Sequence, residues 1–267
     1  MRKALEAWKW SLATLVRSWG LRAALTVLLA LWGLAAYEWL WIPESSALLL
    51  LASSLYAVVQ MLVSVAIIAA SAASAGRAAS AGAKRLPLRS FFGFSGKQFL
   101  QSLVVILVGS LLALGFFAVF GWVNRHSVEV ASFLTFRSEK PVSHVAVENV
   151  YGAIEGLLWI VLAGFVLSFL VNLLHAGWSE AGKKCASTLA GCCFKAPFLT
   201  GLLSVAVFGG LPLLLANWHP RVSPGFWDYT QMIARLGVAL GLLVTGWLFW
   251  LLSLARLHLP RNGNVPS

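Results

Sequence analysis

Two residues of opposite charge lie inside stretches of sequence that are otherwise apolar. Glu155 is about one and a half helical turns into the stretch 150–176, and Arg235 is about two turns into the stretch 229–256. An ionised side chain in hydrocarbon is costly unless it has a partner, reaches water or lines an ion path. Because both stretches should enter the membrane from the same side, we expect Glu155 and Arg235 to form an ion pair between two helices. Separate access to water and a proton or anion pathway are the alternatives.

Three uncharged polar residues occupy similar stretches. Gln60 lies near the middle of the stretch 47–76, with Tyr56 one turn before it, and Asn172 lies near the end of 150–176. Since hydrocarbon offers no hydrogen-bond partner, we expect Gln60 to bond to a neighbouring helix and Asn172 to reach the membrane interface. The alternative is that Gln60 and Asn172 line a substrate path near the midplane, where transporters place such groups.

The fifth apolar stretch contains a run that weakens a helix, namely Gly209, Gly210, Leu211 and Pro212. Glycine lowers helix stability, and proline removes a backbone donor and clashes with the preceding turn. We therefore predict a bend in this helix. The bend serves packing in the first interpretation and acts as a hinge in the second.

The sequence lacks the patterns of the common catalytic and metal sites. There is no HExxH motif, no Walker loop, no paired-carboxylate spacing and no pair of histidines on one helix face. Cys185, Cys192 and Cys193 fall in one predicted cytoplasmic loop, where thiols stay reduced. We interpret them as interfacial cysteines, with acylation or metal binding as alternatives. No catalytic residue, metal or cofactor is predicted, and the protein is not expected to be an enzyme.

One short motif resembles a protease signature. The residues Gly93, Phe94, Ser95 and Gly96 are similar to the GxSG motif of rhomboid serine proteases, which also have six core helices. A rhomboid serine needs a histidine on the last core helix as its base. Here Ser95 falls in a predicted cytoplasmic loop, and the last stretch has no histidine before His258 at its end. The motif therefore predicts no protease activity.

The composition places the elements that carry these residues in a membrane. Of the 267 residues, 60% are apolar and 11% are charged, whereas soluble domains have about 45–50% and about 25%. A helix needs about 20 predominantly apolar residues to cross hydrocarbon. We therefore predict an all-α polytopic membrane protein with six transmembrane helices, which together form one domain, 23–256. The predicted helices span about 23–42, 47–76, 98–124, 150–176, 197–218 and 229–256.

The two ends of the chain are predicted to lie outside these spans. In the segment 1–22, Leu5, Trp8, Leu12, Leu15 and Trp19 recur at helical spacing. This periodicity predicts an amphipathic helix on the inner leaflet of the membrane, with these residues on its apolar face. The alternative is that the first span simply begins earlier. Residues 257–267 are predicted to be a short cytoplasmic tail.

Charge determines the expected orientation. Most of the 20 Lys and Arg residues precede the first span, follow the last, or lie in the loops after the second and fourth. Because basic residues are retained on the cytoplasmic side, both termini are predicted to be cytoplasmic. The net charge of +11 then favours an anionic inner leaflet as partner, and nucleic acid is not expected. Short loops and the many tryptophans suggest the inner membrane of a bacterium.

Small residues suggest two features of the packing. Similar Ala/Gly/Lys segments follow the second and fourth spans at an offset of about 100 residues, which suggests three hairpin repeats, each introduced by an interfacial segment. Coincidence is the alternative. The segment 71–82 is rich in Ala, Ser and Gly, which let helix backbones approach closely, and we predict a packing surface there.

Two classes of function are compatible with this sequence. The dearth of central polar residues, the short loops and the small-residue surface favour a non-enzymatic accessory or scaffold subunit that packs with other membrane proteins or with further copies of itself. The suspected repeats, the bent fifth span, Gln60 and the Glu155/Arg235 pair favour a permease or channel-like transporter of a small molecule, ion or lipid. A polar cavity would indicate transport, whereas a dry core with a broad apolar groove would indicate a partner.

Overall fold

The computed structural model describes residues 2–42, 46–218 and 226–259. These residues are helical throughout, with short connections and no strand. The helices are α1 (Arg2–Arg17), α2 (Trp19–Trp39), α3 (Ala47–Ala81), α4 (Leu88–Phe92), α5 (Gly96–Arg125), α6 (Ser127–Ser138), α7 (His144–Lys183), α8 (Cys185–Phe194), α9 (Ala196–Leu203), the π-helix η1 (Ser204–Gly209), α10 (Gly210–Asn217) and α11 (Phe226–His258).

Six helical segments are long and apolar enough to cross a membrane, as predicted. They are Trp19–Trp39, Ala47–Ala81, Gly96–Arg125, His144–Lys183, Ala196–Leu215 and Tyr229–His258. In chain order, the shorter helices α1, α4 and α8 each precede two of these segments. Local signals set several helix ends. The Ser46 side chain caps α3, and Gly82 ends α3 in the left-handed conformation with a φ of 63°.

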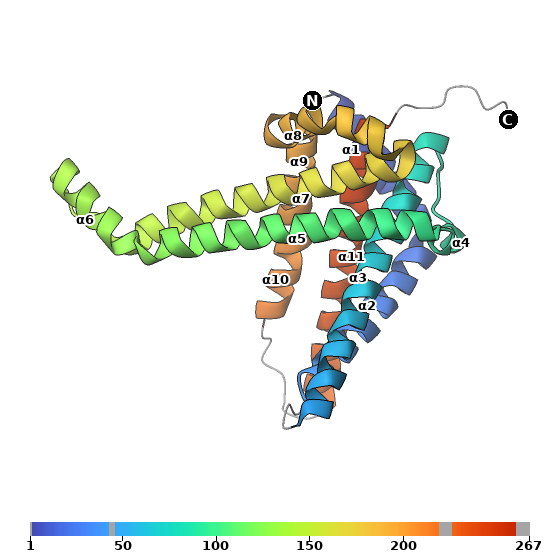
Figure 1. The fold of residues 1–267 in the computed structure, drawn as a ribbon, viewed down its shortest axis with the longest axis horizontal. Coiled ribbons are helices and arrows are strands. Elements are labelled where there is room, and N and C mark those ends of the chain that lie inside the picture. Colours follow the sequence, from blue (N-terminus) through green and yellow to red (C-terminus); the bar gives the residue numbers. More distant parts are fainter. Residues whose placement is uncertain (1, 43–45, 219–225, 260–267) are drawn as a thin grey trace.

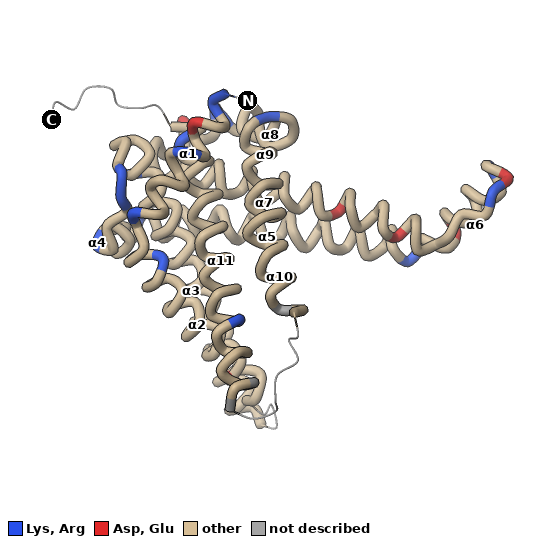
Figure 2. Tube along the Cα trace, turned by 180° about the vertical axis from the view of Figure 1, so that it is seen from behind, with Lys and Arg blue, Asp and Glu red and all other residues tan. Residues whose placement is uncertain are grey.

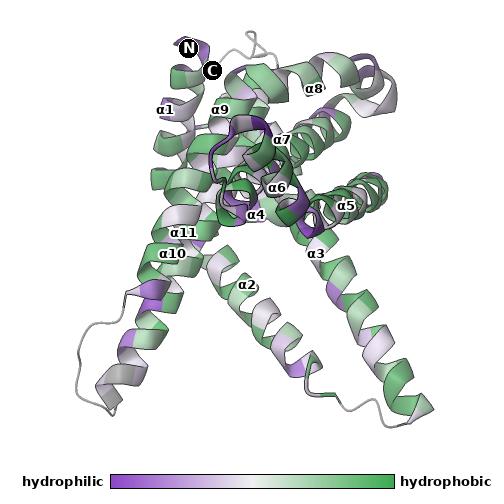
Figure 3. Ribbon diagram, turned by 90° about the vertical axis from the view of Figure 1, so that its left-hand side faces the viewer, coloured by the Kyte–Doolittle hydropathy of each residue, from purple (hydrophilic) through white to green (hydrophobic). Residues whose placement is uncertain are grey.

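The molecule consists of two arms that diverge from a common junction (Figure 1). In the first arm, α2, α3 and α11 run together, with α9, η1 and α10 packed on α11. In the second arm, α5 and α7 lie side by side and carry α6 at the far tip. The junction also holds α1, α4 and α8 (Figure 1). Within the first arm, α2 and α3 separate from α10 and α11 away from the junction (Figure 3).

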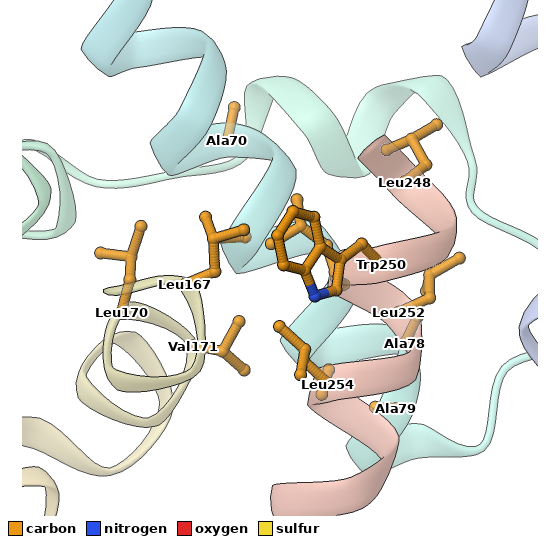
Figure 4. Packing of buried hydrophobic residues seen from close by; sticks show 14 of the residues in the cluster. Ala70, Ala78, Ala79, Leu167, Leu170, Val171, Leu248, Trp250, Leu252 and Leu254 are labelled. Atoms are coloured by element: carbon orange, nitrogen blue, oxygen red, sulfur yellow. The ribbon is translucent and has the colours of Figure 1, made fainter. Parts of the chain in front are cut away.

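The hydrophobic core lies at the junction, where α3, α7 and α11 meet (Figure 4). The small residues of α3 let the larger side chains of α7 and α11 approach its backbone, so the predicted packing surface in 71–82 is buried over most of its length. Trp250 and Leu254 of α11 face Leu167 and Val171 of α7 across this core (Figure 4). Away from the junction the helices are largely exposed, and only 6% of the most apolar window of α5 is buried.

The N-terminal helix α1 packs along α11 through a face of small residues, and most of the predicted lipid-facing residues lie outside this contact. Its buried residues are Ala4, Ala7, Ser11, Thr14 and Leu15, whereas the predicted apolar residues Leu5, Leu12 and Trp19 are exposed. The Ser253 hydroxyl of α11 donates to the Ser11 hydroxyl at 3.0 Å. Small side chains allow this close approach, so the larger apolar residues point away from the protein.

Candidate functional site

A row of hydrogen bonds joins α2 to α3 and involves two of the predicted polar residues. The Tyr56 hydroxyl donates to the carbonyl of Ala35 at 2.9 Å. One turn away, the indole nitrogen Nε1 of Trp39 donates to Ser53 Oγ at 2.9 Å. The backbone carbonyl of Gln60 accepts from Trp32 Nε1 at 3.5 Å. Tyr56 thus joins two helices, and Gln60 does so through its backbone.

The side chain of Gln60 leaves a buried polar atom unsatisfied within the described residues. Its Oε1 atom is buried without a hydrogen-bond partner there. Neither Gln60 nor Tyr56 lines the nearest cavity, which has a volume of about 230 Å³ and lies among α2, α3 and α11. The wall of this cavity is apolar apart from hydroxyls of Ser64 and Ser71 and the indole rings of Trp32 and Trp247. No polar path passes Gln60 here.

The predicted ion pair between Glu155 and Arg235 is not formed. Glu155 Oε1 accepts a hydrogen bond from Trp159 Nε1 at 3.3 Å. The Arg235 guanidinium donates to the backbone carbonyls of Trp218 and Gln231. Within the described chain, the ion pairs are instead two short-range helical contacts, Arg2–Glu6 and Lys183–Glu180.

The divergence of the arms explains this error. Helices α7 and α11 meet in the junction core, where Gly164 lies against Trp250. Glu155 and Arg235 belong to the parts of these helices that point away from the junction, along separate arms (Figure 1). Equal depth along two helices brings side chains together only when the helix axes run side by side.

Asn172 lies in the junction core. Its exposed fraction is 3%, and its neighbours in sequence, Val171 and Leu173, are also buried. Its side chain is therefore enclosed by protein, and its depth relative to the membrane interface stays a prediction. It lines none of the cavities at the junction.

A π-helix lies directly before the run that is predicted to weaken the fifth span. The segment η1 (Ser204–Gly209) ends at the first glycine of the predicted run, and Pro212 lies in α10. Proline has no N–H to donate to the carbonyl four residues earlier, and a wider turn accommodates the lost bond. In this turn the Ser204 hydroxyl donates to the Gly246 carbonyl of α11 at 3.0 Å. The π-helix therefore packs closely against α11.

An apolar cavity of about 240 Å³, called here the inter-arm cavity, lies between the two arms. Its walls come from α3, α5, α7 and α11, and the tryptophans Trp159 and Trp247 lie on them. Outward from this cavity along α7, the residues Gly152, Glu155 and Gly156 share one helix face with Trp159, at spacings of three and four. A Cβ atom placed on either glycine would meet nothing within 4 Å. This face, called here the Glu155 face, is open.

Ser95 of the GxSG motif and the cysteine Cys192 occupy structural positions. Ser95 is the N-cap of α5, where its side chain accepts from the Gln98 backbone N–H and the Gln98 side chain accepts from Ser95 N–H. Cys192 is buried 3.8 Å from the Ser168 hydroxyl, and burial raises the pKa of its thiol. Among the described residues, no group of three or more His, Cys, Asp and Glu side chains is placed to hold a metal ion.

Basic residues gather at the junction end of the molecule. Figure 2 shows Lys and Arg concentrated around α1, α4 and α8, while the acidic residues drawn on the second arm lie along α7 and at its tip. This end contains the chain's start in α1 and the end of α11, where Arg256 lies 5.3 Å above the Trp10 ring. Comparisons with protein-family models, curated proteins and solved structures found no match.

Proposed function

We propose that this protein is a non-enzymatic accessory or scaffold subunit that packs against another membrane protein through the Glu155 face. We place it in the inner membrane of a bacterium, as a multi-pass protein with both termini cytoplasmic. The basic junction end supports this orientation, because Lys and Arg are retained on the cytoplasmic side. The three-hairpin repeat stays a prediction, supported by the position of α1, α4 and α8 before successive spans.

The observation that carries this proposal is the incomplete hydrogen bonding of Glu155. Its carboxylate lies in a candidate span, is half-buried, and has one indole N–H at 3.3 Å as its hydrogen-bond partner among the described residues. A carboxylate has about four acceptor sites. An approaching helix with a hydroxyl, amide or basic side chain would satisfy the remaining sites and lower the cost of burial.

The surroundings of Glu155 suit such a helix. Gly152 and Gly156 are four residues apart on the Glu155 face with open space above both, so a second backbone can approach closely. The inter-arm cavity continues this face toward the junction. It is apolar and offers room for the apolar side chains of the same partner. Hydrophobic residues also predominate along α2, α3 and α5 (Figure 3).

A transporter is the second candidate, and the π-helix together with the diverging arms favours it. Single π-turns inside α-helices recur at functional sites, and two arms that meet at one end could close around a substrate. The lining of the inter-arm cavity argues against a transporter, because its polar side-chain groups are those of Ser110 and the two indole rings. The accessory subunit is therefore the better supported proposal.

Photocrosslinking in intact cells tests the proposal. A photoreactive phenylalanine analogue placed at Gly152 of the full-length chain should give a discrete protein adduct, identified by mass spectrometry. The same analogue at Leu114, which is 64% exposed on α5, should give lipid adducts only.

The partner must then depend on the Glu155 face. We expect Gly156→Leu to abolish the adduct, whereas the control Gly115→Leu, also in open space, should leave it unchanged. Lipid adducts alone at Gly152, together with solitary behaviour of the purified protein in mild detergent, would refute the accessory role.

A further inference from the structure

A second carboxylate lies in line with Glu155 on α7. Glu148 precedes Glu155 by seven residues, which is two helical turns or about 10.5 Å at 1.5 Å per residue. Because a helix has 3.6 residues per turn, both side chains start from the same side of α7. Gly152 lies between them on this side, and a Cβ atom added there would meet nothing within 4 Å. The Glu155 face therefore extends to Glu148 and carries two carboxylates.

Within the described residues, hydrogen bonds but no ion pairs reach these two carboxylates. Glu148 Oε1 accepts from the Ser127 hydroxyl at 3.0 Å, and Glu155 Oε1 accepts from Trp159 Nε1 at 3.3 Å. The ion pairs of the described chain lie elsewhere, in α1 and at the end of α7. The helix packed beside this part of α7 is α5, which contains no charged residue between positions 98 and 124. The neighbouring helix therefore offers no cation along its apolar length.

The surroundings of Glu155 favour a cation as its missing partner. Glu148 lies in the second turn of α7 and is exposed, whereas Glu155 lies two turns deeper in the candidate span and is half-buried. A hydroxyl or amide can donate a hydrogen bond to a carboxylate, but it leaves the negative charge in the hydrocarbon. A Lys or Arg side chain donates a hydrogen bond and also compensates the charge.

A second copy of this chain, docked through the same face, would not supply that cation. A symmetric contact places the same patch of both copies together. The two Glu155 carboxylates would then approach each other, and like charges at close range are unfavourable. The Arg235 guanidinium belongs to the other arm, where it donates to backbone carbonyls. A different protein therefore suits this face better.

We propose that the partner is a transmembrane helix of another protein, with a Lys or Arg inside its apolar span that pairs with Glu155. A second basic residue, two turns along the partner helix, faces Glu148. This inference rests on the accessory role proposed above and names the chemistry of the partner. Gly152 lets the partner backbone approach closely, so its basic side chain can reach Glu155. The Glu155 pair contributes most, because the Glu148 pair is exposed to solvent.

Sequencing of the crosslinked peptide tests this partner directly. The photoreactive phenylalanine analogue is placed at Gly152 of the full-length chain in intact cells, and the adduct is digested and analysed by tandem mass spectrometry. We expect the partner peptide to come from a different membrane protein. It should belong to an apolar segment of about 20 residues that contains a Lys or Arg.

Charge variants in the same crosslinking background test the pairing. Glu155→Gln should lower the adduct yield at least about tenfold, although glutamine keeps an oxygen that can accept from Trp159. Glu148→Gln should lower the yield by less than about fivefold, because that pair is exposed. Glu155→Asp keeps the charge and should retain most of the adduct. The matched control is Glu129→Gln on the exposed first turn of α6, which should leave the yield unchanged.

Several outcomes would overturn the proposal. A partner segment without Lys or Arg, or an unchanged yield with Glu155→Gln, would indicate a hydroxyl or amide partner, or a protonated carboxylate. Equal losses with Glu155→Gln and Glu155→Asp would exclude the requirement for charge. In these three cases the wild-type adduct persists, so the accessory role stands.

Two further outcomes concern the partner itself. An adduct at twice the mass of the chain would show that a second copy occupies the face, and it would overturn the proposal of a basic helix from another protein. The absence of any protein adduct at Gly152 in the otherwise wild-type chain would refute the accessory role, and this inference with it.

Discussion

Substituting Gly246 by Ala should destabilise the protein more than any other single methyl addition on α11. A Cβ atom at Gly246 would lie 2.3 Å from Phe208 Cβ and 2.8 Å from Phe208 Cγ. Ordinary carbon contacts are about 3.5–4.0 Å, so η1 and α11 must separate by about 1 Å. The obstructing atom is the Cβ of Phe208, which cannot move by a change of rotamer.

The expected cost follows from three contributions. Overpacking of this kind costs about 1–3 kcal/mol. The separation would also stretch the Ser204–Gly246 hydrogen bond, now 3.0 Å, whose loss costs about 0.5–1.5 kcal/mol. Replacing a helical glycine by alanine returns about 0.5–1 kcal/mol. The free energy of unfolding should therefore fall by about 0.5–4 kcal/mol in total.

Reversible unfolding in mixed detergent micelles, followed by circular dichroism, measures this change. Gly237→Ala is the matched control, because the same helix offers nothing within 4 Å of a Cβ there, and we expect it to be neutral or stabilising. In the double variant with Phe208→Gly, which removes the obstructing Cβ, the Gly246→Ala cost should shrink by at least about 1 kcal/mol. Equal stability of the two glycine variants would refute the close packing of η1 on α11.

Three further outcomes follow from the same structure. The effects of Glu155→Ala and Arg235→Ala on unfolding free energy should add within about 0.5 kcal/mol in a double-mutant cycle, because the side chains lie on separate arms; a larger coupling would restore the ion pair. Tyr56→Phe should cost about 0.6 kcal/mol through loss of an interhelical hydrogen bond, whereas Tyr37→Phe on the exposed surface should cost nothing measurable. Burial raises the pKa of Cys192, so at a given pH less of it is thiolate. Its alkylation, followed by mass spectrometry, should lag behind that of the other two cysteines and need more alkaline pH, and the lag should vanish after denaturation.

Helix breakers and caps were readable locally because they act within one or two turns. Pro212 and its neighbouring glycines predict a disrupted helix, and the disruption occurs as η1. The sequence does not indicate that the wider turn begins at Ser204, because the start of the π-helix depends on how this segment packs against α11. Ser95 with Gln98 three residues later is a local signal for a helix start, and the GxSG resemblance does not reveal it.

The helix α1 illustrates what hydrophobic periodicity leaves out. Large apolar residues at helical spacing predict the face toward the lipid, whereas the face that packs on α11 consists of small residues around Ser11. Inside a membrane, apolar surface gains little by contacting protein instead of lipid, so close packing and hydrogen bonding select the buried face. The better signal was the run Ala4, Ala7, Ser11, Thr14 and Ser18 at spacings of three and four.

The amino-acid sequence alone determined which segments are long and apolar enough to span a membrane, since length and hydropathy are properties of each segment by itself. Only the tertiary structure decided which intramembrane groups meet. Glu155 and Arg235 are separated because two arms diverge from a core built at one end, around the small residues of α3 and Trp250. Contact depends on the relative direction of helix axes, and that direction is set by packing between segments distant in the chain.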